Sequence, residues 1–337
     1  MIMLYLISFL LSAIFTYFFI KYPWSVADPS IRGMHSIPKP TSGGLGIFIS
    51  ILLLSLYLEI DNIFIFLLIF ISLIGLLDDK YSIGKVIRLI SQLIVPIILL
   101  YYEPMIDENY DLLLYIIIMI SIAYIINIFN FMDGIDLIVS NQTVFILSSL
   151  ILLSFNTIII DINIKTIMLL TLFSILGFSI FNFSPSKIFL GNIGSYLIGF
   201  IIAYIFYKLA IYNSSYIFPI LILSSVFIVE TLFALSKRFI SKFLMIHKDN
   251  RLSLIKNIIS SIAHITEAHC THNYQILAKK YGSHSKVNVI VLVYNLFWCL
   301  PLSYLVLIVP NYSLILTIIC FIPYMIWCYY NQLGDNR

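Results

Sequence analysis

The sequence is poor in charged residues, since Asp, Glu, Lys and Arg together make up only 10% of its 337 residues. A water-soluble domain has roughly 25% charged residues, so this chain has too few polar side chains to cover a surface that faces water. Its formal net charge of +3 is also too small to indicate a nucleic-acid partner. Hydrophobic residues make up 61% of the chain. The composition therefore predicts a protein that is surrounded mostly by lipid.

Several common motifs are missing as well. The four cysteines, at positions 270, 299, 320 and 328, form no CxxC pair, which argues against a disulfide framework or a zinc ribbon. No Walker A loop and no nucleophilic Ser or Cys elbow is present. The first residues are apolar, without a basic n-region or a small-residue cleavage site, so we expect a retained membrane helix there and no cleaved signal peptide.

Apolar runs close to the length that a helix needs to cross a bilayer, about 20 residues, recur along the chain. We expect an all-α polytopic membrane protein with about 11 transmembrane helices (roughly 10–11), forming one integral membrane domain over residues 1–337 without an internal repeat. The candidate spans are residues 2–20, 44–59, 62–78, 86–102, 112–129, 143–160, 166–182, 190–207, 215–236, 288–309 and 312–330. Residues 237–287 form the only long polar segment, which we expect to be a loop.

The positions of the basic residues predict the orientation in the membrane. Loops on the cytoplasmic side carry an excess of Lys and Arg, and with an odd number of spans only Lys165 and Lys208, of 19 basic residues, fall on the opposite side. We therefore expect the N-terminus outside and the C-terminus in the cytoplasm. The 237–287 loop is then cytoplasmic, and so are all the polar clusters described next.

Two glycine-rich stretches lie at this face. Residues 28–46 form a Pro/Gly-rich loop in which Gly43 and Gly44 allow a ligand to approach the backbone closely, although a solvated loop would look the same. Residues 187–200 offer a similar backbone to a phosphate or sugar, and Phe189 offers a flat face to a base. Small residues in that stretch also suit helix packing.

A pair of adjacent carboxylates, Asp78 and Asp79, directly follows the third span. Ionised carboxylates at membrane depth are costly, so they are expected to face a cation, a metal ion or a cavity. Ordinary capping at the membrane interface, with Lys80 and Lys85 as partners, is the alternative.

Four polar residues, Asn127, Asn130, Asp133 and Asp136, recur every three residues at the end of the fifth span. Steps of three keep side chains on one stripe of a helix. A stripe of carboxylates and amides suits a hard cation such as Mg²⁺, which binds one or two carboxylates together with substrate phosphates. A polar seam between helices is the alternative.

The polar stretch 267–286 carries His269 and His272 beside several basic residues. Three adjacent donors cannot all face one tetrahedral ion, so a zinc site built on these histidines and Cys270 is disfavoured. Imidazole and basic donors next to a membrane suit phosphate groups better. Together the clusters supply carboxylates for a metal, basic groups for phosphates and an aromatic ring for a base, which is typical of phosphoryl transfer.

In order and spacing these motifs resemble the polyprenyl-phosphate N-acetylaminosugar-1-phosphate transferases, a family of integral membrane enzymes. The strings that carry the resemblance are NxxNFMDGID from Asn127, the Asp78–Asp79 pair, and EAHxxHxYQxLxxxxGSHxKV from Glu267. The last string is similar to that of the O-antigen-initiating subgroup, whose members resemble N-acetylfucosamine- or N-acetylquinovosamine-phosphate transferases.

The resemblance implies transfer of a sugar-1-phosphate from a UDP-N-acetylhexosamine to undecaprenyl phosphate, with release of UMP, in the bacterial inner membrane with the site on the cytoplasmic face. Similarity to the subgroup favours a 6-deoxy sugar as the group transferred, and O-antigen or another cell-envelope glycan as the polymer that the reaction initiates. Other N-acetylhexosamines are alternative substrates. The implied cofactor is Mg²⁺ or Mn²⁺. The implied partners are membrane lipid and the two substrates, and the resemblance does not decide whether the protein forms a homodimer. The implied metal ligands are Asp78, Asp79, Asp133 and Asn192, of which the three Asp residues are catalytic, and the implied substrate-binding residues are Asn127, Asn130, Asp136, Phe189, Lys85, Arg88, His269, His272, Gly43 and Gly44.

Three positions depart from the pattern of the family. Asn192 stands where an acidic metal ligand is usual, Glu230 stands where an Asp is usual, and Leu137 replaces a common Gly. An amide oxygen binds Mg²⁺ more weakly than a carboxylate, so a catalytically weak homologue is the second hypothesis, unless another acid such as Glu230 compensates. A secondary transporter is the third hypothesis. It is weaker because transporters place their sites near the bilayer midplane between repeats, whereas here the polar clusters are expected at one face and no internal repeat is found.

Overall fold

The computed structural model describes residues 2–29, 37–104, 112–155, 157–248 and 272–333. These residues are almost entirely helical, and a single two-residue antiparallel ladder joins β1 (Val26–Ala27) to β2 (Lys39–Pro40). The α-helices are α1 (Ile2–Lys21), α2 (Gly43–Tyr57), α3 (Asn62–Tyr81), α4 (Lys85–Tyr102), α5 (Leu112–Phe131), α6 (Ile138–Leu153), α7 (Ile162–Asn182), α8 (Gly191–Tyr212), α9 (Ile217–Leu223), α10 (Ser225–Lys248), α12 (Asn273–Tyr281), α13 (His284–Tyr294), α14 (Leu300–Ile308) and α15 (Ser313–Leu333). The short segments η1 (Ser214–Tyr216) and η3 (Pro310–Tyr312) are 3-10 helices, and η2 (Asn295–Cys299) is a π-helical segment.

Eight helices within the described residues are long and apolar enough to cross a bilayer. They are α1, α3, α4, α5, α7, α8, the continuous helix His284–Ile308 and the helix Pro310–Asn331. A bent pair, Ser214–Leu223 with Ser225–Leu244, makes a ninth if it is one span, and α2 and α6 are shorter apolar helices. The all-α polytopic membrane fold is thus confirmed, and each of the expected segments coincides with an apolar helix. The number that crosses the membrane and the side of each terminus stay predictions.

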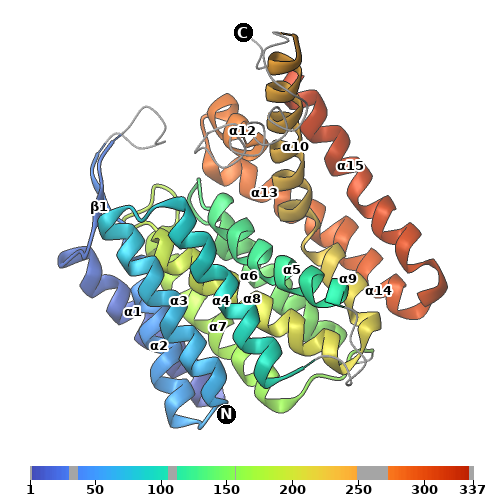
Figure 1. Ribbon diagram of the computed structural model, residues 1–337. Coiled ribbons are helices and arrows are strands. Elements are labelled where there is room, and N and C mark those ends of the chain that lie inside the picture. The colour runs from blue at the N-terminus through green and yellow to red at the C-terminus, as the bar shows by residue number, and fades with distance from the viewer. Residues whose placement is uncertain (1, 30–36, 105–111, 156, 249–271, 334–337) are drawn as a thin grey trace.

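Helix α8 forms the centre of the bundle. It is apolar on all sides, as a helix surrounded by other helices must be, and 89% of its membrane-length stretch is buried. Helices α2, α3 and α5 pack directly against it (Figure 1). Since α3 and α5 end where α8 begins, their polar ends meet at one end of the bundle.

Two expected segments differ from the structure in shape. The sixth was expected at 143–160, but α6 begins at Ile138, directly after Leu137 turns the chain with a φ of +65°. The ninth was expected as one straight span at 215–236, but it bends by 73° at Ser224. The bend frees the carbonyl of Leu223, which accepts a hydrogen bond of 2.9 Å from the Gln142 side chain; such compensation is what makes a broken helix tolerable in lipid.

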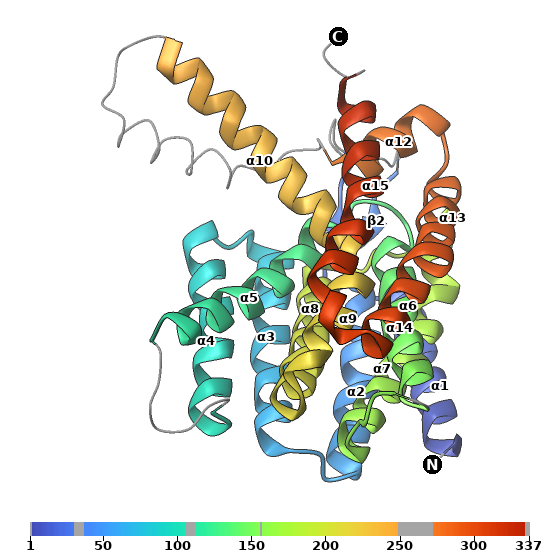
Figure 2. The same ribbon diagram turned by 90° about the vertical axis from the view of Figure 1, so that its right-hand side faces the viewer.

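The polar segment 237–287 is not a plain loop. Helix α10 continues through its first part to Lys248 and leaves the bundle at an angle, as Figure 2 shows. Helix α12 (Asn273–Tyr281) forms near its other end and lies against α13 and α15. Residues 249–271, between these two helices, lie outside the described part of the chain.

Candidate functional site

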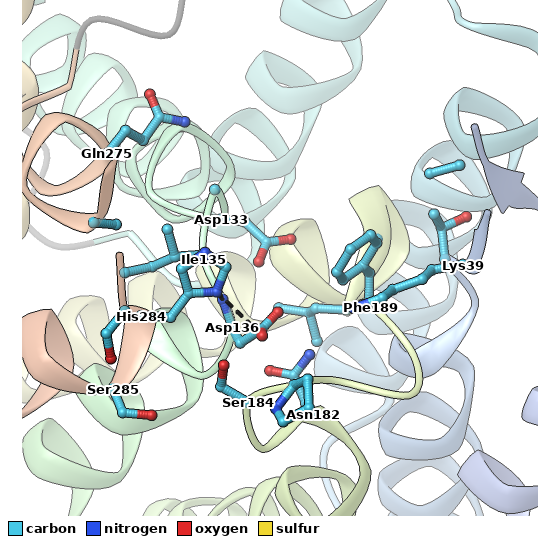
Figure 3. Close-up of a pocket in the computed structure, with 18 of the residues that line it drawn as sticks. Lys39, Asp133, Ile135, Asp136, Asn182, Ser184, Phe189, Gln275, His284 and Ser285 are labelled. Carbon is cyan, nitrogen blue, oxygen red and sulfur yellow. Dashed lines mark hydrogen bonds and ion pairs between the residues drawn. The ribbon is translucent and has the colours of Figure 1, made fainter. Parts of the chain in front are cut away.

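A pocket of about 910 Å³ lies where the ends of α3 and α5 meet the start of α8 (Figure 3). Segments far apart in the sequence form its wall: the last turn of α3, the α5–α6 and α7–α8 loops, the first turn of α8, β2, α12 and the start of α13. The residues that line it are Ala27, Lys39, Thr41, Asp79, Asn130, Asp133, Gly134, Ile135, Asp136, Asn182, Ser184, Pro185, Phe189, Leu190, Gly191, Asn192, Gln275, Ala278, Lys279, Gly282, Ser283, His284 and Ser285.

Asp79 lies at the pocket wall and caps the N-terminus of α8. Its carboxylate accepts the backbone N–H of Asn192 at 2.8 Å and that of Ile193 at 3.1 Å, where a helix has unsatisfied N–H groups and a partial positive charge. Gly191 precedes them with a φ of +76°, and a Cβ there would come within 2.0 Å of the Thr41 carbonyl oxygen. Only glycine therefore allows this approach of α8 to Asp79. The partner of the carboxylate is a helix end and not Lys80 or Lys85.

Asp78 points away from the pocket, although it is adjacent to Asp79. It is only 4% exposed, and its Oδ2 lies 3.3 Å from Arg88 Nη1 and accepts a 2.8 Å hydrogen bond from the Tyr196 hydroxyl. Neighbouring residues on a helix point about 100° apart, which separates the two carboxylates. Asp78 and Arg88 therefore do not line this pocket, and their expected contacts with metal and phosphate stay predictions. Lys85 is exposed at the start of α4 and does not line the pocket either.

The expected stripe of four polar residues is broken because α5 ends at Phe131. Asn127, inside the helix, donates to Gln92 Oε1 and to the Ala123 carbonyl, outside the pocket. Asn130, in the last turn, lines the pocket and donates to Asn192 Oδ1 at 2.9 Å. Its amide group thus joins the end of α5 to the start of α8.

Asp133 and Asp136 follow in the α5–α6 loop and have opposite electrostatic surroundings. Burial raises the pKa of Asp133 to about 8, and the charges of Asp79 and Asp136 add to the rise. Burial also acts to raise the pKa of Asp136, but hydrogen bonds from His284 and Ser186 and the charge of His284 outweigh it and lower this pKa to about 2. Carboxyl groups with such divergent pKa values are typical of active sites.

Phe189 faces the pocket beside Lys39, whose Nζ lies 5.1 Å from the centre of the phenyl ring. Lys39 Nζ also donates to the Ser186 hydroxyl at 3.2 Å. In Figure 3 the two side chains lie across the pocket from Gln275 and His284. An aromatic face next to a cation is suited to a base that carries phosphates.

Gly43 and Gly44 serve packing and not an open ligand surface. Their N–H groups donate to the carbonyls of Phe189 at 3.0 Å and of Leu190 at 2.9 Å. A Cβ on Gly44 would lie 2.3 Å from Gly194 Cα, so these glycines let the start of α2 touch the loop that carries Phe189. These two glycines therefore position the Phe189 loop through backbone contacts.

The structure describes only one of the two histidines of the predicted phosphate-binding motif. His269 lies outside the described residues. His272 precedes α12, stacks on the ring of Tyr274 at 5.7 Å and does not line the pocket. Burial, with a contribution from the charge of Arg238, lowers the pKa of His272 to about 4, and its role as a phosphate ligand stays a prediction.

Several lining residues were not selected from the sequence. Asn182 accepts from the Leu137 N–H and donates to the Ile188 carbonyl, both at 2.8 Å, and so joins the two loops of the pocket. Its position at the end of an apolar run gave no signal that would distinguish it from an ordinary helix end. Lys39, Gln275, Lys279 and His284 lie in clusters that the sequence indicated, but nothing there ranked them above their neighbours.

The donor set of the pocket fits a divalent cation that is shared with substrate phosphates. The described residues hold no group of three or more His, Cys, Asp or Glu able to bind a metal by themselves. Asp79, Asp133 and the amides of Asn130 and Asn192 line one wall region, however, and Mg²⁺ needs only one or two carboxylates when phosphates complete its shell. The mutual repulsion of the pocket carboxylates is a feature that a cation would relieve.

Comparison with known proteins shows similarity to one family. The model of glycosyl transferase family 4 matches residues 62–210, from the start of α3 to the end of α8. A probable undecaprenyl-phosphate N-acetylglucosaminyl 1-phosphate transferase of Bacillus subtilis is 32% identical over 237 residues, which cover 65% of each chain. An undecaprenyl-phosphate alpha-N-acetylglucosaminyl 1-phosphate transferase of Thermotoga maritima is 29% identical over 198 residues, covering 58% of this chain and 60% of the relative.

A phospho-N-acetylmuramoyl-pentapeptide-transferase of Bacillus pumilus is 30% identical over 267 residues, which cover 68% of this chain and 79% of that enzyme. The chain therefore belongs to glycosyl transferase family 4, the polyprenyl-phosphate N-acetylhexosamine-1-phosphate transferases, as its motifs predicted. It matches slightly less than two thirds of the length of the Bacillus subtilis and Thermotoga maritima relatives.

Proposed function

We propose that the protein transfers a sugar-1-phosphate from a UDP-N-acetylhexosamine to undecaprenyl phosphate. An oxygen of the lipid phosphate attacks the phosphorus next to the sugar, the pyrophosphate bond of the UDP-sugar breaks, and UMP leaves. The observation that carries the proposal is one pocket, at the end of a membrane helix bundle, that holds Asp79, Asp133, Asp136, Lys39 and Phe189. Family membership and the names of the relatives support it.

Each part of the pocket has a role in this reaction. Phe189 and Lys39 bind the uridine end through the ring face and the ammonium group, with Asp136 and Asn130 as hydrogen-bonding partners. Asp79 and Asp133, together with Asn192, would hold Mg²⁺ or Mn²⁺, and the cation would supply positive charge to offset that of the diphosphate. The remaining contribution of the protein is positioning, because phosphoryl transfer needs little covalent help from side chains.

The identity of the sugar is part of the proposal. The histidine-containing motif favours a 6-deoxy-N-acetylhexosamine and the start of O-antigen or another envelope glycan, whereas the Bacillus subtilis and Thermotoga maritima relatives are named for N-acetylglucosamine. Membranes that contain the protein should form labelled lipid from undecaprenyl phosphate, Mg²⁺ and one member of a panel of labelled UDP-sugars, with equal release of UMP. Absence of product with every UDP-sugar would overturn the proposed function.

We further propose that the protein lies in the bacterial inner membrane with this pocket at the cytoplasmic face. A reporter inserted after Gly84, between α3 and α4, should report the cytoplasm, because it lies at the pocket end of α3. A reporter after Asn213, at the far end of α8, should report the outside. Gly84 is a suitable site since no atom lies within 4 Å of its Cβ position. A cytoplasmic signal at Asn213 with an external one at Gly84 would reverse the orientation.

Replacement of Asn192 by Asp should strengthen metal binding. The Asn192 Oδ1 accepts from the Asn130 amide, and an Asp would accept the same bond while adding the negative charge that Mg²⁺ favours. The Mg²⁺ concentration for half-maximal rate should fall about tenfold, which corresponds to about 1.4 kcal/mol. Titration of Mg²⁺ against rate for both proteins measures the change.

The same titration tests the hypothesis of a weak homologue, in which Asn192 leaves the metal site short of one charge. Glu230 does not compensate, because it is buried away from the pocket, where it accepts from the Tyr274 N–H and the Tyr324 hydroxyl. An activity seen only after Asn192→Asp would mean that the natural chain is the weak homologue. An unchanged or higher Mg²⁺ requirement would show that Asn192 is not a metal ligand.

A further inference from the structure

Helix α13 lies outside the stretch that matches the family model, yet its first residue reaches the nucleotide end of the pocket. His284 Nδ1 lies 3.1 Å from Asp136 Oδ2, to which a protonated ring donates, and 3.3 Å from the backbone nitrogen of the same residue, whose N–H a neutral ring accepts. Figure 3 shows the His284 ring directed at Asp136 from the side opposite Phe189 and Lys39. His284 has no role in the reaction proposed for this pocket.

Asp136 is held from a second side by Ser186. The Ser186 hydroxyl donates to Oδ1 at 2.7 Å, and its N–H donates to Oδ2 at 3.3 Å. The backbone is held too, because the Asn288 amide donates to the Asp136 carbonyl at 2.8 Å and to the His284 carbonyl at 3.1 Å. The side chain of Asp136 therefore cannot rotate without losing bonds to both α13 and the α7–α8 loop.

The burial of Asp136 makes these contacts important. The residue is only 5% exposed, and a buried carboxylate that loses its partner tends to take up a proton. A protonated carboxyl presents an O–H donor where the carboxylate presents only acceptors. Since the imide group of uracil offers an N–H donor, a uridine needs the acceptor form in a constant orientation.

We propose that His284 is a positioning residue that, with Ser186, holds Asp136 as a hydrogen-bond acceptor for the uridine part of the substrate. The inference rests on the proposed function, and it deepens it by assigning recognition of the nucleotide partly to the C-terminal region of the chain. His284 acts through Asp136 and does not contact the reacting phosphorus. Its loss is expected to weaken binding of the nucleotide and to leave the chemical step intact.

The test is steady-state kinetics on the full-length protein in detergent or nanodiscs, with UDP as a competitive inhibitor. His284→Ala should raise both the KM for the UDP-sugar and the inhibition constant of UDP about tenfold, the size typical of a lost charge-assisted hydrogen bond. The kcat and the KM for undecaprenyl phosphate should stay within about twofold. UDP carries no sugar, so a parallel change in its inhibition constant places the effect at the nucleotide.

Two further variants separate positioning from general damage. His284→Asn retains an N–H at the position of Nδ1 and should recover most of the lost affinity for UDP. Lys286→Ala, in the same helical turn but exposed to solvent, should leave all constants unchanged. In an Asp136→Ala background, His284→Ala should have no further effect, because the residue through which it acts is gone.

The possible failures are distinguishable. If the wild-type protein uses no UDP-sugar and UDP does not bind, the proposed function falls and the inference falls with it. If the wild-type protein is active but His284→Ala leaves the KM for the UDP-sugar unchanged, only the inference is wrong. A fall of kcat and of lipid affinity equal to the loss of nucleotide affinity would also overturn it, since that pattern indicates a distorted fold.

Discussion

Replacement of Asp133 by Asn should lower the rate of sugar-phosphate transfer at least about a hundredfold at saturating substrates and Mg²⁺, as loss of a well-placed charge commonly does. The side chain faces the pocket near Asp79 and Asp136, and Asn has the same shape but cannot supply the negative charge that an ionised Asp133 would present to the proposed cation. The measurement is the rate per mole of folded protein, from the incorporation assay and quantification in the membrane.

The stability of the Asp133→Asn protein should not fall. The pKa of Asp133 in the folded protein, about 8, is above the value of 3.8 for a free side chain. The folded state therefore holds more protons than the unfolded state between these pH values, and the stability of the wild-type protein falls as pH rises from about 4 to about 8. Asn removes this loss, so the variant should unfold at an equal or higher temperature at pH 8.

A matched control for Asp133→Asn is Asp161→Asn. Asp161 is also an acidic residue at a helix end, where its carboxylate accepts the Asn163 N–H at 2.7 Å, but it lies at the end of α7 remote from the pocket. Its replacement should leave the rate unchanged and cost about 1 kcal/mol of stability or less. If Asp133→Asn retains more than a tenth of the wild-type rate, a charge at this position takes no essential part in the reaction.

Most of the helices were predictable because each apolar run approaches the thickness of a bilayer. Their breaks were not, since these depend on partners that are distant in sequence. Ser224 ends α9 where Gln142, on α6, is available to bond the Leu223 carbonyl. Helix α6 begins earlier in the chain than predicted, for a similar reason. Leu137 adopts a φ of +65°, and its N–H donates to the Asn182 side chain.

Leu137 also shows what a resemblance adds to a sequence. The family commonly has Gly here, and the positive φ gives the physical reason, because the left-handed region disfavours side chains by about 1–2 kcal/mol. The spans expected from hydropathy, 112–129 and 143–160, leave Leu137 between them and give no signal at this position. The departure from the family pattern thus marked a residue that holds the α5–α6 loop in a strained conformation.

The composition of the pocket was predictable, whereas the direction of individual side chains was not. A spacing of three residues placed Asn127 with Asp133 and Asp136, but that rule holds only within a helix, and α5 ends at Phe131. Similarly, the adjacency of Asp78 and Asp79 in the sequence does not show which carboxylate faces the start of α8. That choice is made by the packing of α3 against α8.

The adjacent acids should therefore respond differently to the same substitution, although the sequence alone gives them one role. Asp79→Asn should lower the rate per folded molecule at least about a hundredfold, because it removes a pocket charge beside the proposed metal site. An amide can accept one of the two N–H groups of α8 but presents its own N–H₂ to the other. We expect a further loss of about 1–2 kcal/mol in stability from this mismatch.

Asp78→Asn should instead act mainly on stability. It leaves Arg88 without its carboxylate partner and weakens the bond from the Tyr196 hydroxyl. The Arg88 side chain is 31% exposed, so solvent screens part of the loss, and about 1–3 kcal/mol is expected. The rate per folded molecule should stay within about tenfold of the wild-type value. Thermal unfolding in detergent and specific activity, measured on the same samples, separate the two effects.

The double variant Asp78→Asn/Arg88→Met provides the sharpest comparison. Removing both charges of a buried pair is far less damaging than removing one, since no unpaired charge remains. The double variant should therefore recover most of the unfolding temperature that Asp78→Asn loses, and Asp79→Asn should gain nothing from Arg88→Met. If Asp78→Asn instead loses as much specific activity as Asp79→Asn while remaining folded, then Asp78 acts in the reaction. Its burial against Arg88 and Tyr196 would in that case have to change when substrate binds.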